Sequence, residues 1–100
     1  MSHHNARHDP YGGLQGANRR AARIAGSTLR RVTGRPDWAC RRDAVTVIRA
    51  LLAGRDPRQA LCAASGGLLG WVTAERIADV VVRQARHEWA AEAERRGAAS

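Results

Sequence analysis

The chain is 100 residues long and carries a formal net charge of +8, from 17 basic and nine acidic residues. Every basic residue is arginine. Hydrophobic residues make up 44% of the chain, but 20 of them are alanine, and leucine, isoleucine and valine together number only 17. So few large apolar side chains, with a high net charge, approach the composition of disordered chains. The composition therefore excludes a large enzyme and predicts a thin core that a homodimer or another partner would help to stabilise.

The sequence carries no pattern typical of secreted, zinc-binding or membrane-spanning proteins. Cys40 and Cys62 lie far apart and form no paired-cysteine motif, so neither a disulfide framework nor a zinc site is expected. The longest uncharged stretch, residues 59–74, contains three glycines and is too short for a bilayer-spanning helix. The first 18 residues lack the apolar run of a signal peptide. We therefore expect a cytoplasmic protein that does not associate with membranes.

Residues 1–16 show no apolar periodicity and are expected to form a flexible arm. Residues 17–35 then follow a helical pattern, with small and apolar residues on one side of the helical wheel (Ala22, Ala25, Leu29 and Val32). Arginines occupy the opposite side (Arg19, Arg20, Arg23, Arg30 and Arg31). This separation predicts a basic amphipathic helix, although Gly26 lowers the helix propensity in its middle.

Asp37 is the expected N-cap of a second helix, because its carboxylate can accept a hydrogen bond from the first turn. The residues expected to share the apolar face of that helix are Trp38, Ala44, Val45, Ile48, Leu51 and Leu52. Arg42 and Arg49 border this face, and Gly54 is placed to stop the helix.

Asp56 followed by Pro57 predicts the start of a short third helix, because an acidic cap and a proline at the first position both suit a helix N-terminus. Gly66 and Gly67 are expected to end it. Thr73 is the expected cap of the last helix, which runs to about residue 96. Its apolar residues recur every four positions (Ile77, Val81, Ala85 and Trp89).

Because no segment alternates as a strand does, the sequence predicts an all-α fold, a small bundle of about four helices with a flexible N-terminal arm. Its parts are the arm (residues 1–16), the arginine-rich amphipathic helix (17–35) and a helical core (37–97). The final helices do not resemble a helix-turn-helix motif closely, since their connector is about seven residues long and the last helix has no net charge.

The whole surplus of positive charge lies in residues 19–58, where 11 arginines face three aspartates. Such a concentration of charge is typical of proteins with a polyanionic partner. We therefore expect a small nucleic-acid-binding protein, with DNA in preference to RNA, of the kind found as phage or plasmid regulators or accessory subunits. The residues expected to contact phosphates are Arg19, Arg20, Arg23, Arg30, Arg31, Arg41, Arg42 and Arg49.

The alternative is a non-enzymatic adaptor or assembly protein that binds an acidic protein or forms a homodimer. Its surface would be apolar, since tryptophan is favoured at interface hot spots. The residues of this expected interface are Leu68, Leu69, Trp71, Val80, Val82 and Trp89.

Catalysis is not expected, because the few acidic residues have structural roles such as caps and ion pairs, and neither cysteine has a base beside it. No cofactor or functional metal is expected either. His3, His4 and His8 lie in the predicted arm, without carboxylate or thiolate ligands held near them.

Overall fold

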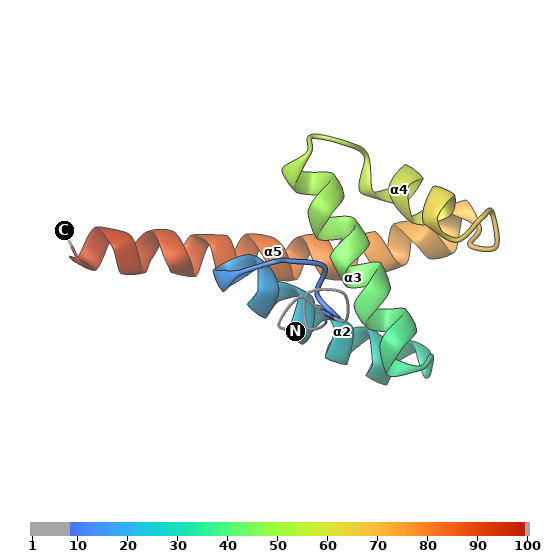
Figure 1. Ribbon diagram of the computed structural model, residues 1–100, viewed down its shortest axis with the longest axis horizontal. Helices are drawn as coiled ribbons and strands as arrows, with labels where there is room; N and C mark the ends of the chain where they lie inside the picture. The colour runs from blue at the N-terminus through green and yellow to red at the C-terminus, as the bar shows by residue number, and fades with distance from the viewer. Residues whose placement is uncertain (1–8, 100) are drawn as a thin grey trace, which may run out of the picture.

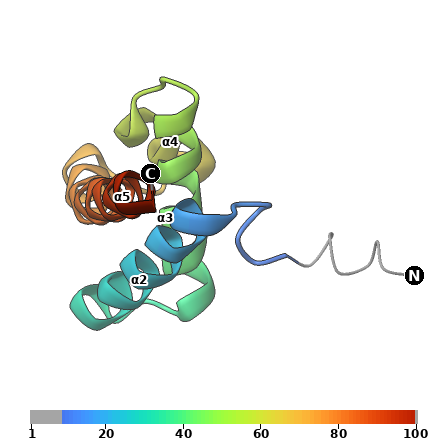
Figure 2. The ribbon, with the colours of Figure 1, turned by 90° about the vertical axis from the view of Figure 1, so that its left-hand side faces the viewer.

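The computed structural model describes residues 9–99, most of which belong to four helices (Figure 1). These are α2 (Gly16–Thr33), α3 (Asp37–Leu52), α4 (Pro57–Ala64) and α5 (Trp71–Ala99). Because residues 9–99 contain no strand, the predicted all-α class and the four-helix bundle are confirmed. Figure 2, a view along α5, shows α3 running beside it, with α4 above and α2 below.

Helix α2 continues without a break through Gly26, which is buried against α3. A Cβ atom built on Gly26 would lie 3.5 Å from the Cα of Arg41, so this glycine allows the two helices to pack closely. The helix ends before Gly34, whose φ of +71° is left-handed and whose N–H donates to the carbonyl of Arg30 at 2.9 Å. Glycine is the residue that adopts this helix-ending conformation most readily.

The expectation that Asp37 caps α3 is wrong. The helix begins at Asp37 itself, Pro36 occupies the cap position, and no side chain caps the first turn. Asp37 instead pairs with Arg30, whose Nε lies 3.3 Å from its carboxylate. The chain leaves α3 through Gly54, which has a φ of +70°.

The expectation for α4 is confirmed, since Asp56 accepts a hydrogen bond from the backbone N–H of Arg58 at 2.9 Å and Pro57 opens the helix. That hydrogen bond holds the pKa of Asp56 below its usual value. Two successive glycines with positive φ, Gly66 and Gly67, follow the helix as expected.

Helix α5 begins at Trp71, so the expected cap at Thr73 is wrong and this residue lies within the first turn. The N–H of Ala74 already donates to the carbonyl of Gly70 at 2.9 Å, which explains the earlier start. The C-terminal part of α5 extends well beyond the other helices (Figure 1). None of the helices in residues 9–99 combines the length with the apolar run that a membrane span requires.

The core lies between α2, α3 and α5, with α4 closing one end. Alanines that are fully buried let the helix axes approach closely, and they include Ala21, Ala22, Ala25, Ala44, Ala74 and Ala85. The largest buried side chains are Leu29, Ile48, Leu61 and Ile77. Trp38 and Leu52, which were expected on the apolar face of α3, are 58% and 55% exposed. The buried side of α3 is centred instead on Cys40, Ala44 and Val47.

The segment before α2 packs against the bundle from Asp9 onward, whereas the sequence predicts a flexible arm as far as residue 16. The Asp9 carboxylate accepts hydrogen bonds from the N–H groups of Tyr11 and Gly13, at 2.9 and 3.0 Å. Leu14 is 7% exposed and belongs to the core. The remainder of the predicted arm, residues 1–8, lies outside the described residues.

Candidate nucleic-acid interface

Helix α2 presents arginines to water on the side opposite its buried face. Ala21, Ala25 and Leu29 are at most 2% exposed, whereas four arginines are exposed (Arg19, Arg23, Arg30 and Arg31). Val32 departs from the predicted wheel, because it lies at the end of α2 and is 72% exposed. The arginine face of α2 is therefore present much as the helical periodicity predicts.

Arg20 connects α2 to α5 rather than projecting into solvent. Its Nε donates to Oε1 of Glu88 at 2.7 Å, while Nε2 of Gln84 donates to Oε2 at 3.2 Å. Glu88 is 7% exposed, and the hydrogen bond from Arg20 holds the pKa of this carboxyl below its usual value. This ion pair gives Arg20 a structural role in the bundle.

Three other arginines of the predicted site also have carboxylate neighbours. Arg19 lies 3.3 Å from Asp9, and Arg30 lies 3.3 Å from Asp37. Arg42 is 3.7 Å from Asp43, which has a closer partner at 2.7 Å in Arg35. The Arg30–Asp37 pair, in which both side chains are exposed, would be exchanged for a phosphate at little cost, because surface pairs contribute only about 0–1 kcal/mol.

The other four predicted arginines, Arg23, Arg31, Arg41 and Arg49, have no ion pair with any residue of the described chain. Nη2 of Arg31 donates a hydrogen bond to the hydroxyl of Thr28, at 3.5 Å. Two of these residues lie on α2 and two on α3, so adjacent helices share an uncompensated positive charge. We call these four residues the uncompensated arginines of α2 and α3.

Among the residues that the structure describes, unpaired arginines also lie outside the predicted site, most of them on the last helix, which the sequence reasoning treated as neutral. Glu75, Glu88 and Glu92 pair with Arg58, Arg20 and Arg95. As a result, no ion pair within residues 9–99 involves Arg55, Arg76, Arg83 or Arg86. A helical wheel of the last helix places Arg76 and Arg83 opposite the buried Ile77, Val81 and Ala85, so it would have indicated that these arginines are exposed.

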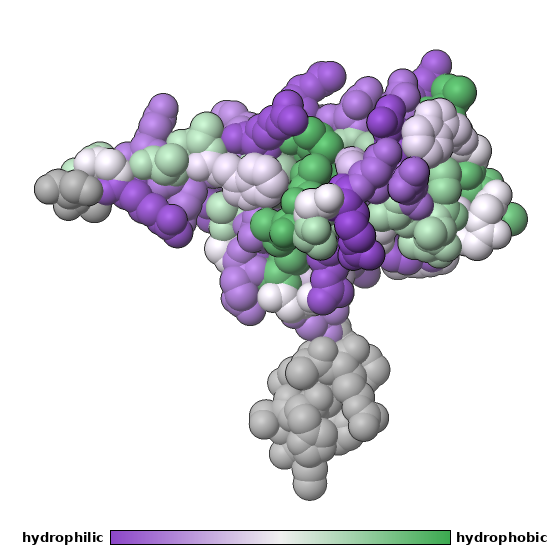
Figure 3. Space-filling view, turned by 90° about the horizontal axis from the view of Figure 1, so that it is seen from above, coloured by the Kyte–Doolittle hydropathy of each residue, from purple (hydrophilic) through white to green (hydrophobic). Residues whose placement is uncertain are grey.

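Two shallow hollows flank the turn before α2. One has a volume of about 300 Å³ and is lined by Tyr11, Gly16, Arg19, Arg20 and Arg23. The other, of about 390 Å³, is lined by Gly12, Gly13, Leu14, Arg49, Leu52, Ala53 and Arg55. From above, hydrophilic side chains flank an apolar strip on the surface (Figure 3).

The turn itself holds two of the arginines in place. The guanidinium of Arg19 lies over the ring of Tyr11, 4.6 Å from its centre. A Cβ built on Gly12 would come 3.1 Å from Nη1 of Arg49, so the side chain of Arg49 packs directly on this glycine. The hydrogen bond from the Tyr11 N–H also holds the pKa of Asp9 low, which keeps the carboxylate that organises the turn ionised.

The residues of the expected protein interface do not form one surface. Leu68 and Trp71 are exposed, at 90% and 47%, near the start of α5. The others are partly buried against the core (Leu69, Val80, Val82 and Trp89). Trp89 lies 18 residues after Trp71 on one helix, or about 27 Å along its axis.

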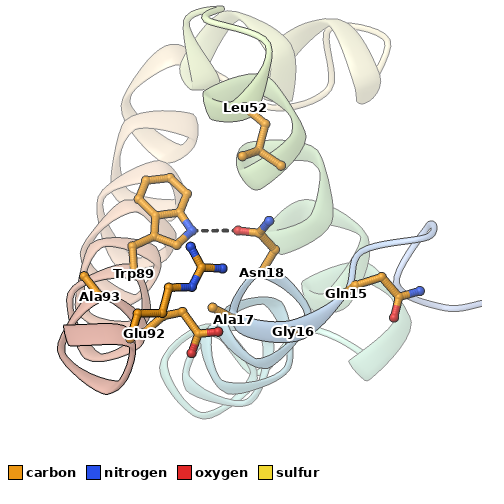
Figure 4. Close-up of a pocket in the computed structure, with 9 residues that line it drawn as sticks. Gln15, Gly16, Ala17, Asn18, Leu52, Trp89, Glu92 and Ala93 are labelled. Carbon is orange, nitrogen blue, oxygen red and sulfur yellow. Dashed lines mark hydrogen bonds between the residues drawn. The ribbon is translucent and has the colours of Figure 1, made fainter. Parts of the chain in front are cut away.

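Trp89 lines a hollow of about 430 Å³ between α2 and α5 (Figure 4). Its indole Nε1 donates to Oδ1 of Asn18 at 2.6 Å. The wall of the hollow also includes Leu52, Glu92 and Arg96. Trp89 is thus engaged within the chain, and only Leu68 and Trp71 of the expected interface remain well exposed.

Within residues 9–99 no group of three or more histidine, cysteine or acidic side chains could hold a metal ion. The three histidines that the sequence singles out, His3, His4 and His8, lie outside this range. Cys40 is buried and Cys62 is partly buried, and both are free thiols.

The chain matches no protein-family model, no curated protein and no solved structure. The uncompensated arginines of α2 and α3, with the turn that packs beside them, are therefore the features from which a function is inferred.

Proposed function

We propose that the protein binds nucleic acid, DNA in preference to RNA, through contacts between arginines and backbone phosphates. The observation that supports this most strongly is that Arg23, Arg31, Arg41 and Arg49 are found on two adjacent helices without carboxylate partners among residues 9–99. Guanidinium groups donate two parallel hydrogen bonds to one phosphate, which suits them to this ligand. Release of the counterions bound to nucleic acid would supply much of the affinity.

The proposed preference for DNA is supported by the arginine face of α2, which lies along one 18-residue helix. The major groove of B-form DNA is about 12 Å wide and admits an α-helix, whereas that of A-form RNA is too narrow for side chains to read. Sequence selectivity would be low, because the exposed groups are charges rather than amides placed to read base edges. Such binding suits a regulator or accessory subunit of phage or plasmid type.

The proposed role is binding without catalysis. Seven of the nine carboxylates take part in ion pairs with arginine (Asp9, Asp37, Asp43, Asp56, Glu75, Glu88 and Glu92). Every carboxyl whose pKa is shifted has it lowered, mainly by hydrogen bonds. A general acid would need the opposite shift, toward the working pH.

The test is fluorescence anisotropy with a labelled random duplex at several salt concentrations. If four phosphates are neutralised, the logarithm of affinity should fall against the logarithm of salt with a slope of about −3.6. The triple variant Arg23→Gln, Arg31→Gln, Arg49→Gln should weaken binding and reduce the slope by about 2.7.

The matched control is the triple variant Arg76→Gln, Arg83→Gln, Arg86→Gln, which removes the same charge from α5. Its arginines also lack ion pairs within the described part of the chain, so both variants should keep the bundle intact. We expect a much smaller loss of affinity from this control. Equal losses in the two variants would contradict the α2 and α3 interface, and no binding by the unaltered protein would contradict the function.

A second candidate function, that of an adaptor or assembly protein, is favoured by the apolar tip formed by Leu68, Trp71 and Val72. These side chains are 90%, 47% and 68% exposed, next to one another at the start of α5. Clustered exposed apolar residues mark protein interfaces more often than isolated ones do. The partner would be a second copy of this chain or an acidic protein.

Light scattering over a range of protein concentrations tests this candidate. A dimer that Leu68→Glu converts to a monomer, and that Val32→Glu leaves unchanged, would support it. Val32 is a suitable control because it is also apolar and 72% exposed, but lies on α2. A monomer at all concentrations would exclude the homodimer, and an acidic protein would then be the partner expected for this candidate function.

A further inference from the structure

An exposed tryptophan and two arginines lie along one side of α3. Trp38, Arg42 and Arg49 are all exposed, and on a helical wheel they fall within about 40° of one another. Trp38 lies in the first turn of α3 and Arg49 about 16 Å further along the axis. The opposite side of the helix, which includes Cys40 and Val47, is fully buried. We call Trp38, Arg42 and Arg49 the α3 stripe.

Trp38 is arranged as a stacking surface. The guanidinium carbon of Arg42 lies 5.2 Å from the centre of its ring and covers one face. Trp38 nevertheless remains 58% exposed, so much of its surface is in contact with water. A large aromatic ring that remains hydrated contributes little to the stability of the fold. The ring is therefore accessible to an aromatic ligand.

The charge around Trp38 favours an anion. Residues 30–43 contain five arginines and two aspartates. Asp43 lies closer to Arg35, at 2.7 Å, than to Arg42, at 3.7 Å. The guanidinium of Arg42 is therefore only weakly neutralised, and Arg49 has no ion pair within the described residues.

Trp71 offers a contrast within the same chain. It also carries an arginine on its ring, Arg58 at 5.0 Å, and it is 47% exposed. Arg58, however, pairs with both Asp56 and Glu75, at 3.3 and 3.1 Å. The hydrogen bonds that Arg58 donates to Asp56 and Glu75 raise the pKa of Arg58, as expected for a compensated charge. A phosphate next to Trp71 would meet two carboxylates.

We propose that the α3 stripe binds unpaired nucleotides of DNA, with one base stacked on Trp38 and the adjoining phosphates on Arg42 and Arg49. In a duplex each base is already stacked between its neighbours, so an exposed indole gains a base only from a single strand or an unpaired end. Stacking of bases on aromatic side chains, beside a positive track for the backbone, is how proteins bind single strands without sequence preference. This inference deepens the proposed function and rests on it.

The test compares a labelled 20-nucleotide oligo(dT) with a 20-base-pair duplex in anisotropy titrations. Trp38→Ala should weaken binding of the single strand roughly 5- to 150-fold, the range of one lost stacking contact, and change duplex affinity by about twofold or less. Trp38→Leu should behave like Trp38→Ala, whereas Trp38→Phe should restore part of the affinity. These two variants keep apolar bulk, so loss of folding is separated from loss of the aromatic face.

Trp71→Ala is the matched control, since it removes an exposed, arginine-covered indole from a different helix, α5. It should leave both affinities unchanged. If both DNAs bind but Trp38→Ala has no effect on the single strand, or Trp71→Ala has the same effect, the stacking site is refuted and the phosphate-binding function stands. If the unaltered protein binds neither DNA, both proposals fail.

Discussion

Gly26 of α2 packs against the backbone of Arg41 in α3, and a Cβ built at this glycine would lie 3.5 Å from the Arg41 Cα and 3.7 Å from its N. These distances are ordinary van der Waals separations, so a methyl group fits but a longer side chain meets backbone. Gly26 is helical, without the positive φ that would require glycine. The closest approach of α2 and α3 is therefore limited to a small residue, but not to glycine.

Gly26→Ala should stabilise the protein by about 0.5–1 kcal/mol, because alanine has the higher helix propensity and restricts the unfolded chain. Gly26→Leu should destabilise it by about 1–3 kcal/mol, the usual range for overpacking. Urea unfolding followed by circular dichroism measures both changes. A loss of stability in Gly26→Ala would show that the two helices are closer than the structure has them.

Arg20 and Arg23 are neighbouring arginines with different roles, and substitution should separate them. Arg20→Gln removes the 2.7 Å hydrogen bond to Glu88 and should lower the free energy of unfolding by about 1–3 kcal/mol. Arg23→Gln should change stability by less than about 0.5 kcal/mol, since Arg23 is exposed and forms no ion pair with the residues that the structure describes. In DNA titrations the relative size of the two effects should reverse. Arg23→Gln should reduce DNA affinity more than Arg20→Gln does, while both variants remain folded.

The Arg20–Glu88 ion pair should also make stability depend on pH. The folded state lowers the pKa of Glu88, chiefly through the hydrogen bond from Arg20. A lowered folded pKa means that the contribution is complete above the unfolded pKa, about 4.3, and is lost as the pH falls through the folded value. The urea concentration at the unfolding midpoint should therefore decrease as the pH is lowered below about 5. Glu88→Gln should reduce this dependence of stability on pH. An unchanged pH dependence would contradict the role given to the Arg20–Glu88 ion pair.

Much of the fold follows from local sequence signals. Gly54 follows the end of α3 as expected, and the separation of arginines from alanines on α2 follows from periodicity alone. The Asp56 cap was recognisable because Pro57 follows it at the first helical position. Signals of this kind act within a few residues of the chain and do not depend on packing.

Other features depend on which elements pack together, and the sequence alone could not specify them. Leu14 enters the core because the turn organised by Asp9 folds back onto the bundle, and Trp38 remains exposed because α3 packs on its Cys40 side. Likewise, the pairing of Arg20 with Glu88 joins residues 68 positions apart. A net charge summed over a segment cannot reveal such a pair, which is why Arg20 was expected at the binding surface.

The two aspartates expected to cap helices provide the last test, because only one of them does so. Asp56→Ala should lower the melting temperature by about 4–8 °C, since it leaves the N–H of Arg58 without its acceptor. Asp37→Ala should lower it by no more than about 2 °C, since Asp37 forms only an exposed ion pair with Arg30. Thermal unfolding followed at 222 nm compares the two variants under one condition. Equal decreases would contradict the start of α3 at Asp37, because they would require its carboxylate to bond the first turn.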